Sequence, residues 1–396
     1  MRKIPIDQLK PGMTLARTIF NDVGSVLLQR GVILSEAYIN ALRRRGFVAV
    51  FVRDGIADDI QPQEMISQRV RVAVRRHLRA IFVTLQRYNE ECGGSEDCLK
   101  SGLGERIAPL IKQLCNDVEN IVDEILSTEA ISGIISLRSH DNYTFEHSVD
   151  VTVSGVLLGR KLHLPLDNLR QLALGCLLHD IGKLLVPQGI LNKVEPLSIS
   201  ELAIIQQHPR LGYDIARHIV PPEQLPACHV VYQHHERQDG TGYPRGLQGG
   251  NGISVRRPGQ EFVETGRILP IAEIAAVADV YSALASDRPY RPALEPSSIV
   301  TCLNKMAGNH LNREMVMHFT SIVPPFPVGS RVVITSGKLK GYSGVVAEVN
   351  PAKIHQPVVR IIFDPQRKEI APFLVDTSQE PKMEIASDAT EWPVAL

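Results

Sequence analysis

The stretch LALGCLLHDIGK, residues 172–183, decides the fold of this chain. Its first seven residues are apolar or small, which predicts a helix buried on every side, and His179 and Asp180 follow at its end. A carboxylate at the end of a buried helix is costly unless a cation or hydrogen-bond donors compensate its charge. The pair could bind metal, with Asp180 bridging two ions, or it could be ordinary polar capping completed by Gly182 and Lys183. The motif alone leaves both interpretations open.

Several other polar residues stand at or inside apolar helical segments. His147 precedes one such segment, His208 lies at a helix boundary before Pro209, and Asp279 lies within the almost wholly apolar residues 268–286. Each of them alone is more often a satisfied core or boundary group than a ligand. Five histidines and two aspartates share this setting: His147, His179, Asp180, His208, His234, His235 and Asp279. A helical bundle delivers metal ligands inward in this way, and an imidazole and carboxylate set suits Fe, Mn, Zn, Co or Ni.

The composition bounds the class of protein. A chain of 396 residues is long enough for two or three domains with cores of their own. Lys+Arg and Asp+Glu both number 43, so the net charge of zero gives no argument for binding a nucleic-acid polymer. No apolar run approaches the ~18 residues of a transmembrane helix, and the first residues lack the apolar core of a signal peptide. We therefore expect a cytoplasmic protein with reduced cysteines, since its cysteines form no CxxC pair.

Hydrophobic periodicity predicts a mainly α protein in four parts. Residues 1–60 alternate short apolar runs with Gly and Pro, which predicts a small α+β module. Residues 61–127 hold two long helical patterns that link this module to residues 128–322, which are apolar and helical. β-Branched runs separated by Gly, Asn and Pro predict a β-rich module with a polar tail over 323–396. The basic amphipathic helix expected at 64–88 could lie on a membrane or pair two chains, but packing within the chain is the favoured interpretation.

Three motifs together resemble a known family. They are HDIGK at 179–183, HHERQDGTGYPRGLQG at 234–249 and ADVYSALASDRPYRP at 278–292. They are similar to the HD-GYP family of bacterial cyclic di-GMP phosphodiesterases, within the HD class of metal-dependent phosphohydrolases, and the resemblance covers about residues 135–320. It implies a helical-bundle catalytic domain that hydrolyses cyclic di-GMP to linear pGpG and, after a second cut, to GMP.

The resemblance also implies roles for individual residues. The seven histidines and aspartates above match the family's metal-ligand positions, with Asp180 bridging two divalent ions, Fe or Mn first and other transition metals open. Asp180 and Lys183 would be the catalytic pair, with Lys183 near the scissile phosphate. The substrate-binding positions would be Gly242, Tyr243, Pro244, Arg288 and Arg291. A hydroxide formed from a water shared by the two metals would attack the phosphorus.

Three positions depart from the family pattern. Some members hold a third metal with a Glu one helical turn before the first His, where this chain has Tyr143, so we expect two metals. The segment between Gly249 and Gly266 is longer than usual and could form a lid or a wall of the site. Ser282 stands where an Asp is expected, at a position that is not a ligand.

Several alternatives stay open at this level. The chain could be a catalytically weak sensor of cyclic dinucleotides that acts through protein contacts, an HD-class hydrolase of another nucleotide, or a structural helical protein. Asp239 is expected to make a turn rather than support a ligand, whereas Glu236 is ambiguous. Tyr243 could stack on a guanine or pack its own loop. The expected partners are a cyclic dinucleotide, signalling proteins and a second copy of the chain.

Overall fold

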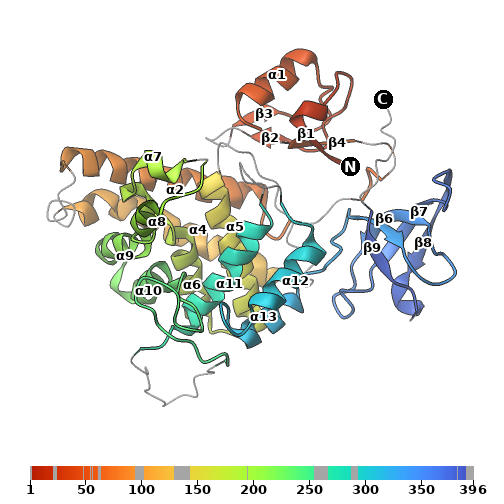
Figure 1. The fold of residues 1–396 in the computed structure, drawn as a ribbon. Helices are drawn as coiled ribbons and strands as arrows, with labels where there is room; N and C mark the ends of the chain where they lie inside the picture. The colour runs from red at the N-terminus through yellow and green to blue at the C-terminus, as the bar shows by residue number, and fades with distance from the viewer. Residues whose placement is uncertain are drawn as a thin grey trace.

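The computed structural model describes residues 2–20, 25–47, 49–53, 55, 57–60, 64–93, 102–128, 143–193, 195–253, 266–286, 293–380 and 382–388. It is mainly helical, as predicted, with a small N-terminal module and a C-terminal sheet on one side of a large helical body (Figure 1). Among the helices of the described ranges, none combines the length and the apolar character that crossing a membrane requires.

The N-terminal module is a small α+β unit, which confirms the prediction. Strand β1 (Arg2–Pro5) pairs antiparallel with β4 (Ala49–Val52), and β2 (Ile19–Phe20) pairs with β3 (Val26–Leu28). Helix α1 (Glu36–Arg44) begins after Ser35, whose side chain accepts a hydrogen bond from the Tyr38 amide. A separate small core closes the module, with Leu15, Leu34 and Val52 among its most buried side chains.

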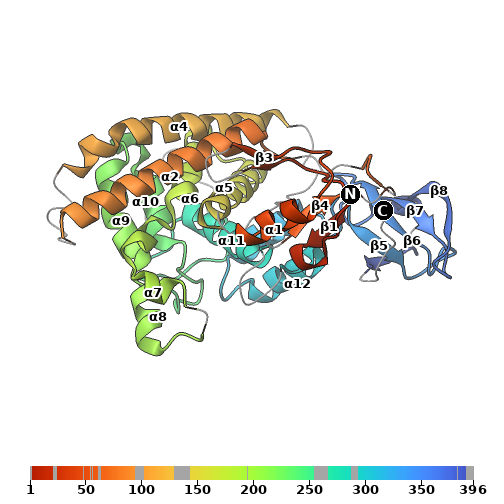
Figure 2. The ribbon, with the colours of Figure 1, turned by 90° about the horizontal axis from the view of Figure 1, so that it is seen from above.

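Two long helices lie side by side along the helical body (Figure 2). They are α2 (Gln68–Glu91) and α4 (Leu103–Ser127), and their apolar side chains belong to the same core as the rest of the body. The basic helix predicted at 64–88 therefore packs within the chain. Cys92, at the end of α2, is disulfide-bonded, which corrects the expectation of reduced cysteines for this residue. Cys115, Cys176, Cys228 and Cys302 are free thiols.

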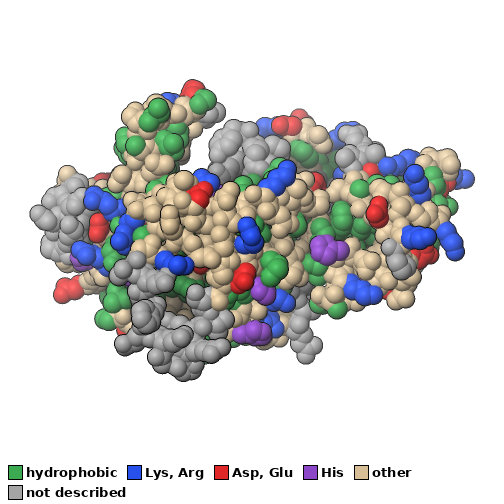
Figure 3. All heavy atoms as spheres, turned by 60° about the horizontal axis from the view of Figure 1, so that its bottom comes forward, with side chains coloured by type: hydrophobic (Ala, Val, Ile, Leu, Met, Phe, Trp, Pro, Cys, Tyr) green, Lys and Arg blue, Asp and Glu red, His purple; other side chains and the backbone are tan. Residues whose placement is uncertain are grey.

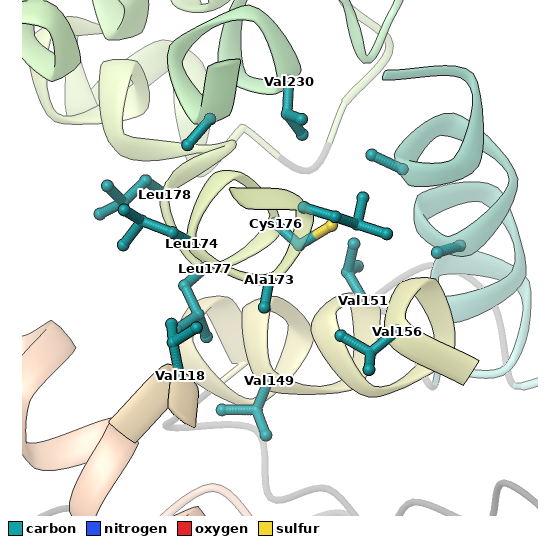
Figure 4. Packing of buried hydrophobic residues seen from close by; sticks show 14 of the residues in the cluster. Val118, Val149, Val151, Val156, Ala173, Leu174, Cys176, Leu177, Leu178 and Val230 are labelled. Carbon is teal, nitrogen blue, oxygen red and sulfur yellow. The ribbon is translucent and has the colours of Figure 1, made fainter. Parts of the chain in front are cut away.

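Helix α6 (Leu166–Leu178) forms the centre of the helical body, as the 172–183 motif predicts. Figure 4 shows its side chains between α5 (Tyr143–Lys161) on one side and α10 (Leu225–Gln233) on the other. Every residue from 172 to 178 is buried, so a helix without a polar face is covered on all sides. The remaining elements of the body are η3 (Ile181–Leu185), α7 (Gln188–Leu191), α8 (Ile199–Ile205), α9 (His208–Ile219), η4 (Pro222–Gln224), α11 (Pro270–Leu284), α12 (Pro296–Met306) and α13 (Arg313–Thr320).

A glycine allows two of these elements to meet beside the HDIGK motif. A Cβ at Gly182, in η3, would collide with the carbonyl oxygen of His208 and with the amide nitrogen of Gly212. The backbone of η3 therefore lies directly against the first turn of α9. This contact brings His208 next to His179 and Asp180, which precede Gly182.

The C-terminal residues form a five-stranded antiparallel sheet, which confirms the β-rich module. The strands are β5 (Arg331–Ile334), β6 (Ser343–Glu348), β7 (Val358–Phe363), β8 (Glu369–Asp376) and β9 (Ile385–Ser387), in the order β8-β7-β6-β5-β9. The segment that leaves the N-terminal module packs on this sheet through Ala57 and Ile60. Arg360 on β7 makes two hydrogen bonds to Asp59, at 2.8 and 2.7 Å.

The described surface carries no large field of one charge on the face drawn in Figure 3, where acidic and basic side chains are interspersed. Helices α7 and α8 project from the body in Figure 2, and this projection stands at the upper left of Figure 3 with several hydrophobic side chains on it. Ile199 is the most exposed of them, at 91 %.

Candidate metal centre

Helices α5, α6, α9, α10 and α11 bring the seven predicted ligand residues together. His147 is the fifth residue of α5, Asp279 lies inside α11, and His208 is the first residue of α9. The remaining four directly follow α6 and α10: His179, Asp180, His234 and His235. Six of them fall into two groups whose ligand atoms lie within 4.8 Å of one another, His147–His179–Asp180 and His208–His234–His235. All seven are buried except His235, which is half-buried.

Two histidines of the first group lie beside Asp279. The Nε2 atom of His147 lies 2.9 Å from Asp279 Oδ1, and the Nε2 atom of His179 lies 4.0 Å from the same oxygen. Asp180 Oδ2 lies 3.4 Å from His179 Nε2. Burial alone would raise the pKa of Asp279, but His147 and His179 hold that pKa well below its usual range. The group therefore keeps two carboxylates charged beside two imidazoles.

The second group is a cluster of imidazoles. The Nε2 atoms of His208 and His234 lie 3.3 Å apart, and the His235 ring lies 4.2 Å from the His234 ring and 5.0 Å from the His208 ring, between centroids. Burial lowers the pKa of His208 to about 4 and that of His235 to about 3, and burial beside the neighbouring imidazoles holds the pKa of His234 well below its usual value. At neutral pH these three imidazoles are neutral, which is the form that binds metals.

Three of the histidines are oriented by the carbonyls of the helix that precedes each of them. Their Nδ1 atoms lie 2.7 Å from the Cys176 carbonyl for His179, 2.8 Å from that of Ile205 for His208 and 2.9 Å from that of Val231 for His234. In each case the carbonyl lies three residues upstream, among the groups that a helix end leaves without a helical partner. With the proton on Nδ1, each Nε2 is an acceptor that points into the site.

This arrangement fits divalent metal ions. Nε2 lone pairs of His208 and His234 face each other, so no hydrogen bond can join them, whereas a shared cation can. Asp180 Oδ1 is buried without a hydrogen-bond partner, although it lies 3.5 Å from His208 Nε2. An unpaired buried carboxylate oxygen between two imidazole groups is costly unless a cation lies there. The donor set of nitrogen and oxygen atoms suits transition metals.

Lys183 lies beside the carboxylate of Asp180. Its Nζ atom lies 2.6 Å from Asp180 Oδ2, and its side chain is 29 % exposed. Burial would raise the pKa of Asp180, but the charges of His179 and Lys183 keep it well below its usual range. Lys183 thus carries a positive charge at the border between the buried centre and solvent, where an anionic group could meet it.

The loop that contains Gly242, Tyr243 and Pro244 folds back over the second group. A Cβ at Gly242 would lie 2.6 Å from both Glu236 Cα and His235 O, so only glycine allows this approach. The Tyr243 ring stacks on the His235 ring at 4.8 Å and 28°. Tyr243 therefore covers a candidate ligand, and the GYP motif forms the wall of the site next to His235.

Two acids in this loop hold its backbone. The buried carboxylate of Glu236 accepts hydrogen bonds from the amides of Arg245 and Leu247, both at 2.8 Å. Asp239 accepts bonds from the amide and the hydroxyl of Thr241, at 3.0 and 2.6 Å. Asp239 therefore makes the expected turn, and Glu236, which was ambiguous from the sequence, stabilises the loop from inside.

Some predicted site residues lie outside the described residues. They are Arg288 and Arg291, together with residues 254–265 of the segment expected to form a lid. The two described ends of that segment are anchored. The Asn251 amide donates to Gln238 Oε1 at 3.0 Å, the Ile253 amide donates to Glu314 Oε2 at 2.7 Å, and the Ile268 amide donates to the Gln248 carbonyl at 3.2 Å.

Sequence reasoning missed two buried polar residues of α11. Ser282 Oγ lies 3.0 Å from His147 Nδ1, so the position set aside for lacking an Asp contacts a candidate ligand. Its place three residues after Asp279, on the same side of α11, was the available signal. Glu273 was also missed; it is buried and accepts hydrogen bonds from Gln238 Nε2 at 2.6 Å and from Asn312 Nδ2 at 3.1 Å.

The residues of this candidate site lie within a match to a known domain family. The HD domain family matches residues 134–315, and the KOW motif matches residues 328–364. The chain is similar to the cyclic di-GMP phosphodiesterase PA4108 of Pseudomonas aeruginosa, with 29 % identity over 93 % of this chain and 86 % of the relative. It is 33 % identical to the cyclic di-GMP phosphodiesterase response regulator RpfG of Xanthomonas campestris, over 49 % of this chain and 46 % of that protein.

A third relative acts on a different cyclic dinucleotide, by its name. It is the 3'3'-cGAMP-specific phosphodiesterase 1 of Vibrio cholerae, 33 % identical over 46 % of this chain and 38 % of its own length. The HDIGK and DGTGYP motifs, at 179–183 and 239–244, lie inside the residues matched by the HD domain and line one buried site. Residues 134–315 thus match the HD domain family, and the chain is similar over most of its length to a cyclic di-GMP phosphodiesterase.

Proposed function

We propose that the protein is an enzyme that hydrolyses cyclic di-GMP to linear pGpG and, after a second cut, to GMP, at a centre that holds two divalent metals. One observation carries the proposal: Asp180 belongs to one group of candidate ligands, and its buried, unpaired Oδ1 lies 3.5 Å from His208 of the other group. A carboxylate in this position can serve both groups at once. The names of the relatives PA4108 and RpfG support cyclic di-GMP as the substrate.

Each predicted ligand has a place in this proposal. His147, His179 and Asp279 would hold one metal, and His208, His234 and His235 would hold the other, with Asp180 shared by both. When bound, two such metals acidify a water and neutralise charge on a phosphate. Iron or manganese is proposed first, because the oxygen and nitrogen ligands suit them and the described part of the site contains no thiolate ligand.

The chain's own residues would bind and orient the substrate. Lys183 would hold an oxygen of the scissile phosphate, since its ammonium lies next to Asp180 at the solvent border of the site. The loop of Gly242, Tyr243 and Pro244 would exclude water beside His235 and form a wall for the dinucleotide. Arg288 and Arg291 would bind its phosphates. A phosphodiester is hydrolysed mainly through such positioning and charge neutralisation.

The test is hydrolysis of cyclic di-GMP by anaerobically purified protein loaded with iron or manganese. The expected result is release of pGpG by the wild type and loss of hydrolysis in the His179→Ala/Asp180→Ala variant. His355→Ala, an exposed histidine of the C-terminal module, is the matched control and should retain full activity. Hydrolysis that survives in the His179→Ala/Asp180→Ala variant would show that the reaction does not use this centre.

The same preparation separates the proposal from its rivals. A panel of cyclic di-GMP, cyclic GMP-AMP, cyclic di-AMP and ordinary nucleotides tests the substrate class, since one similar protein is named for 3'3'-cGAMP. Preference for a mononucleotide would favour an HD-class hydrolase of another kind. Metal-loaded protein that binds cyclic di-GMP without cleaving it would favour a sensor that acts through protein contacts.

We also propose the four-part organisation of residues 1–60, 61–127, 128–322 and 323–396. Separate cores in the N-terminal module and the C-terminal sheet support it. The helices within 61–127 share their core with the helical body, so we propose that they act as one unit with it. Signalling-protein partners and pairing with a second copy stay part of the proposal, to be tested by light scattering and pull-down with purified candidates.

A further inference from the structure

A buried cluster of ion pairs joins α2 to α5 next to the metal centre. Arg71 Nη1 lies 3.0 Å from Glu146 Oε2 and 2.9 Å from Asp150 Oδ1, and Arg75 Nη1 lies 2.6 Å from Glu146 Oε1. The side chain of Arg71 is 13 % exposed, that of Glu146 6 % and that of Asp150 4 %. Two cations therefore neutralise two buried carboxylates, the condition under which buried charges are tolerated.

The two carboxylates lie on either side of His147 in the sequence of α5. Glu146 directly precedes His147, and Asp150 follows it by three residues, about one helical turn. Because a helix is stiff, contacts to Glu146 and Asp150 determine how this turn is rotated about its axis, and hence where His147 points. Metal ligands must reach their ion to within about 0.2 Å, so a small rotation of the turn is enough to weaken binding.

We propose that Arg71 is a positioning residue that holds His147 in place for metal binding by contacting α5 on both sides of it. The inference rests on the proposed function, since it assumes that His147 is a metal ligand. Arg71 lies on α2, outside the residues matched by the HD domain. A second contact between the same helices, the Phe82 and Phe145 rings at 5.1 Å, keeps α2 on α5 when Arg71 is changed.

The test measures metal affinity rather than activity. Metal-free wild-type protein and the Arg71→Gln variant are titrated with Co²⁺, and the two binding steps are assigned with His147→Ala and His235→Ala. We expect Arg71→Gln to weaken one metal-binding step about 10–100-fold, the usual effect of losing a residue that supports a ligand. This is the step that His147→Ala removes. The step that His235→Ala removes should be unchanged.

Three further variants make the result specific. Arg69→Gln changes an exposed arginine two residues away on the same helix and should leave both steps intact. Arg71→Lys keeps the charge and should restore part of the lost affinity. In the His147→Ala background, Arg71→Gln should leave the remaining binding step unchanged, because the residue acts through His147. Equal weakening of both steps in the Arg71→Gln variant, or weakening of the remaining step in the double variant, would overturn the proposal.

A last variant covers the case in which Arg71→Gln does not fold. Arg71→Gln/Asp150→Asn removes a cation and an anion together and leaves Glu146 paired with Arg75. It should fold and show the same selective loss of one metal, whereas wild-type affinity for both metals would overturn the positioning role. Wild-type protein that binds no Co²⁺ would overturn the metal centre itself, so the two failures are distinguishable.

Discussion

His208 and His234 direct their Nε2 atoms at each other across 3.3 Å, while the Nδ1 atom of each lies within 2.9 Å of a backbone carbonyl. Two neutral imidazoles held in this way direct their Nε2 lone pairs at each other. The repulsion between them is relieved by a cation, and both rings are already oriented for it. The two rings therefore need no reorganisation to bind an ion between them.

The first prediction follows from this geometry. Since the metal would bind only the folded protein, manganese at a thousand times its dissociation constant is expected to stabilise the fold by about 4 kcal/mol per site. Thermal unfolding with manganese and with a chelator measures the difference. The His208→Ala variant should lose much of this stabilisation by manganese, and the His355→Ala variant should keep all of it. A wild-type melting temperature that is the same in both solutions would contradict the prediction.

Lys183 gives a prediction that separates binding of metal from catalysis. The Lys183→Met variant is expected to keep both metals but to lose hydrolysis of cyclic di-GMP by about 10²–10³-fold, because a donor to the phosphate is missing. Metal content and kcat/KM are measured on the same sample. Lys193→Met removes a lysine that pairs with Glu201 outside the site, at 2.8 Å, and serves as the control. If Lys183→Met loses its metals, the lysine instead supports Asp180.

A substitution at Gly242 tests the close approach of the GYP loop to the backbone of His235 and Glu236. In the Gly242→Ala variant the new methyl group would press on the backbone at His235 and Glu236, with an expected cost of about 1–3 kcal/mol. We expect KM for cyclic di-GMP to rise more than kcat falls, because the loop is a wall of the site. The Gly189→Ala variant is the control, because no atom lies within 4 Å of the added Cβ. Its melting temperature should be at least as high as that of the wild type. The role of Gly242 would be refuted if the Gly242→Ala and Gly189→Ala variants had the same stability and the same KM.

Glu273 predicts a pH dependence of stability. Burial raises its pKa from 4.5 to about 7, although the hydrogen bonds from Gln238 and Asn312 and the charge of Arg267 oppose the shift. Between pH 4.5 and pH 7, Glu273 therefore keeps its proton in the folded state but has lost it in the unfolded state. The contribution of Glu273 to the free energy of unfolding should fall by up to about 3 kcal/mol as the pH rises from 4.5 to 7.

The measurement compares wild-type protein with Glu273→Gln by urea unfolding at several pH values, with metal removed from both. The difference between the two free energies of unfolding should change over this pH range and be constant above it. A difference that does not vary between pH 4.5 and 7 would mean that the hydrogen bonds keep Glu273 ionised throughout. The histidines of the metal centre titrate in both proteins, so their effect cancels in the difference.

Much of the helical body could be predicted from residue patterns because its signals are strong. Residues 172–178 are apolar without a polar face, and a helix of that kind is buried wherever it lies. Asp279 and His179 stood out because charged or polar side chains are rare within such segments. The glycine, asparagine and proline positions after residue 324 likewise indicated short strands, and β5 to β9 confirm them.

Other features depend on which helices pack together, and the sequence has no local signal for that. Ser282 was set aside, yet α11 places its hydroxyl 3.0 Å from His147. Arg71 was one of several arginines on a basic helix, and only the packing of α2 on α5 distinguishes it from exposed Arg69. The pairing of ligands into two groups is also invisible in their order along the chain, because residues 147 and 179 join Asp180 while 208, 234 and 235 form the other group.

The sequence by itself thus determined the candidate ligand residues and the helices near them, because both follow from the local contrast between polar and apolar residues. Only the tertiary structure decided which Nε2 atoms face one another and which arginine contacts α5 beside His147. Those relationships join residues 26 to 79 positions apart, and they arise when helices with no mutual sequence signal bury their apolar sides in one core.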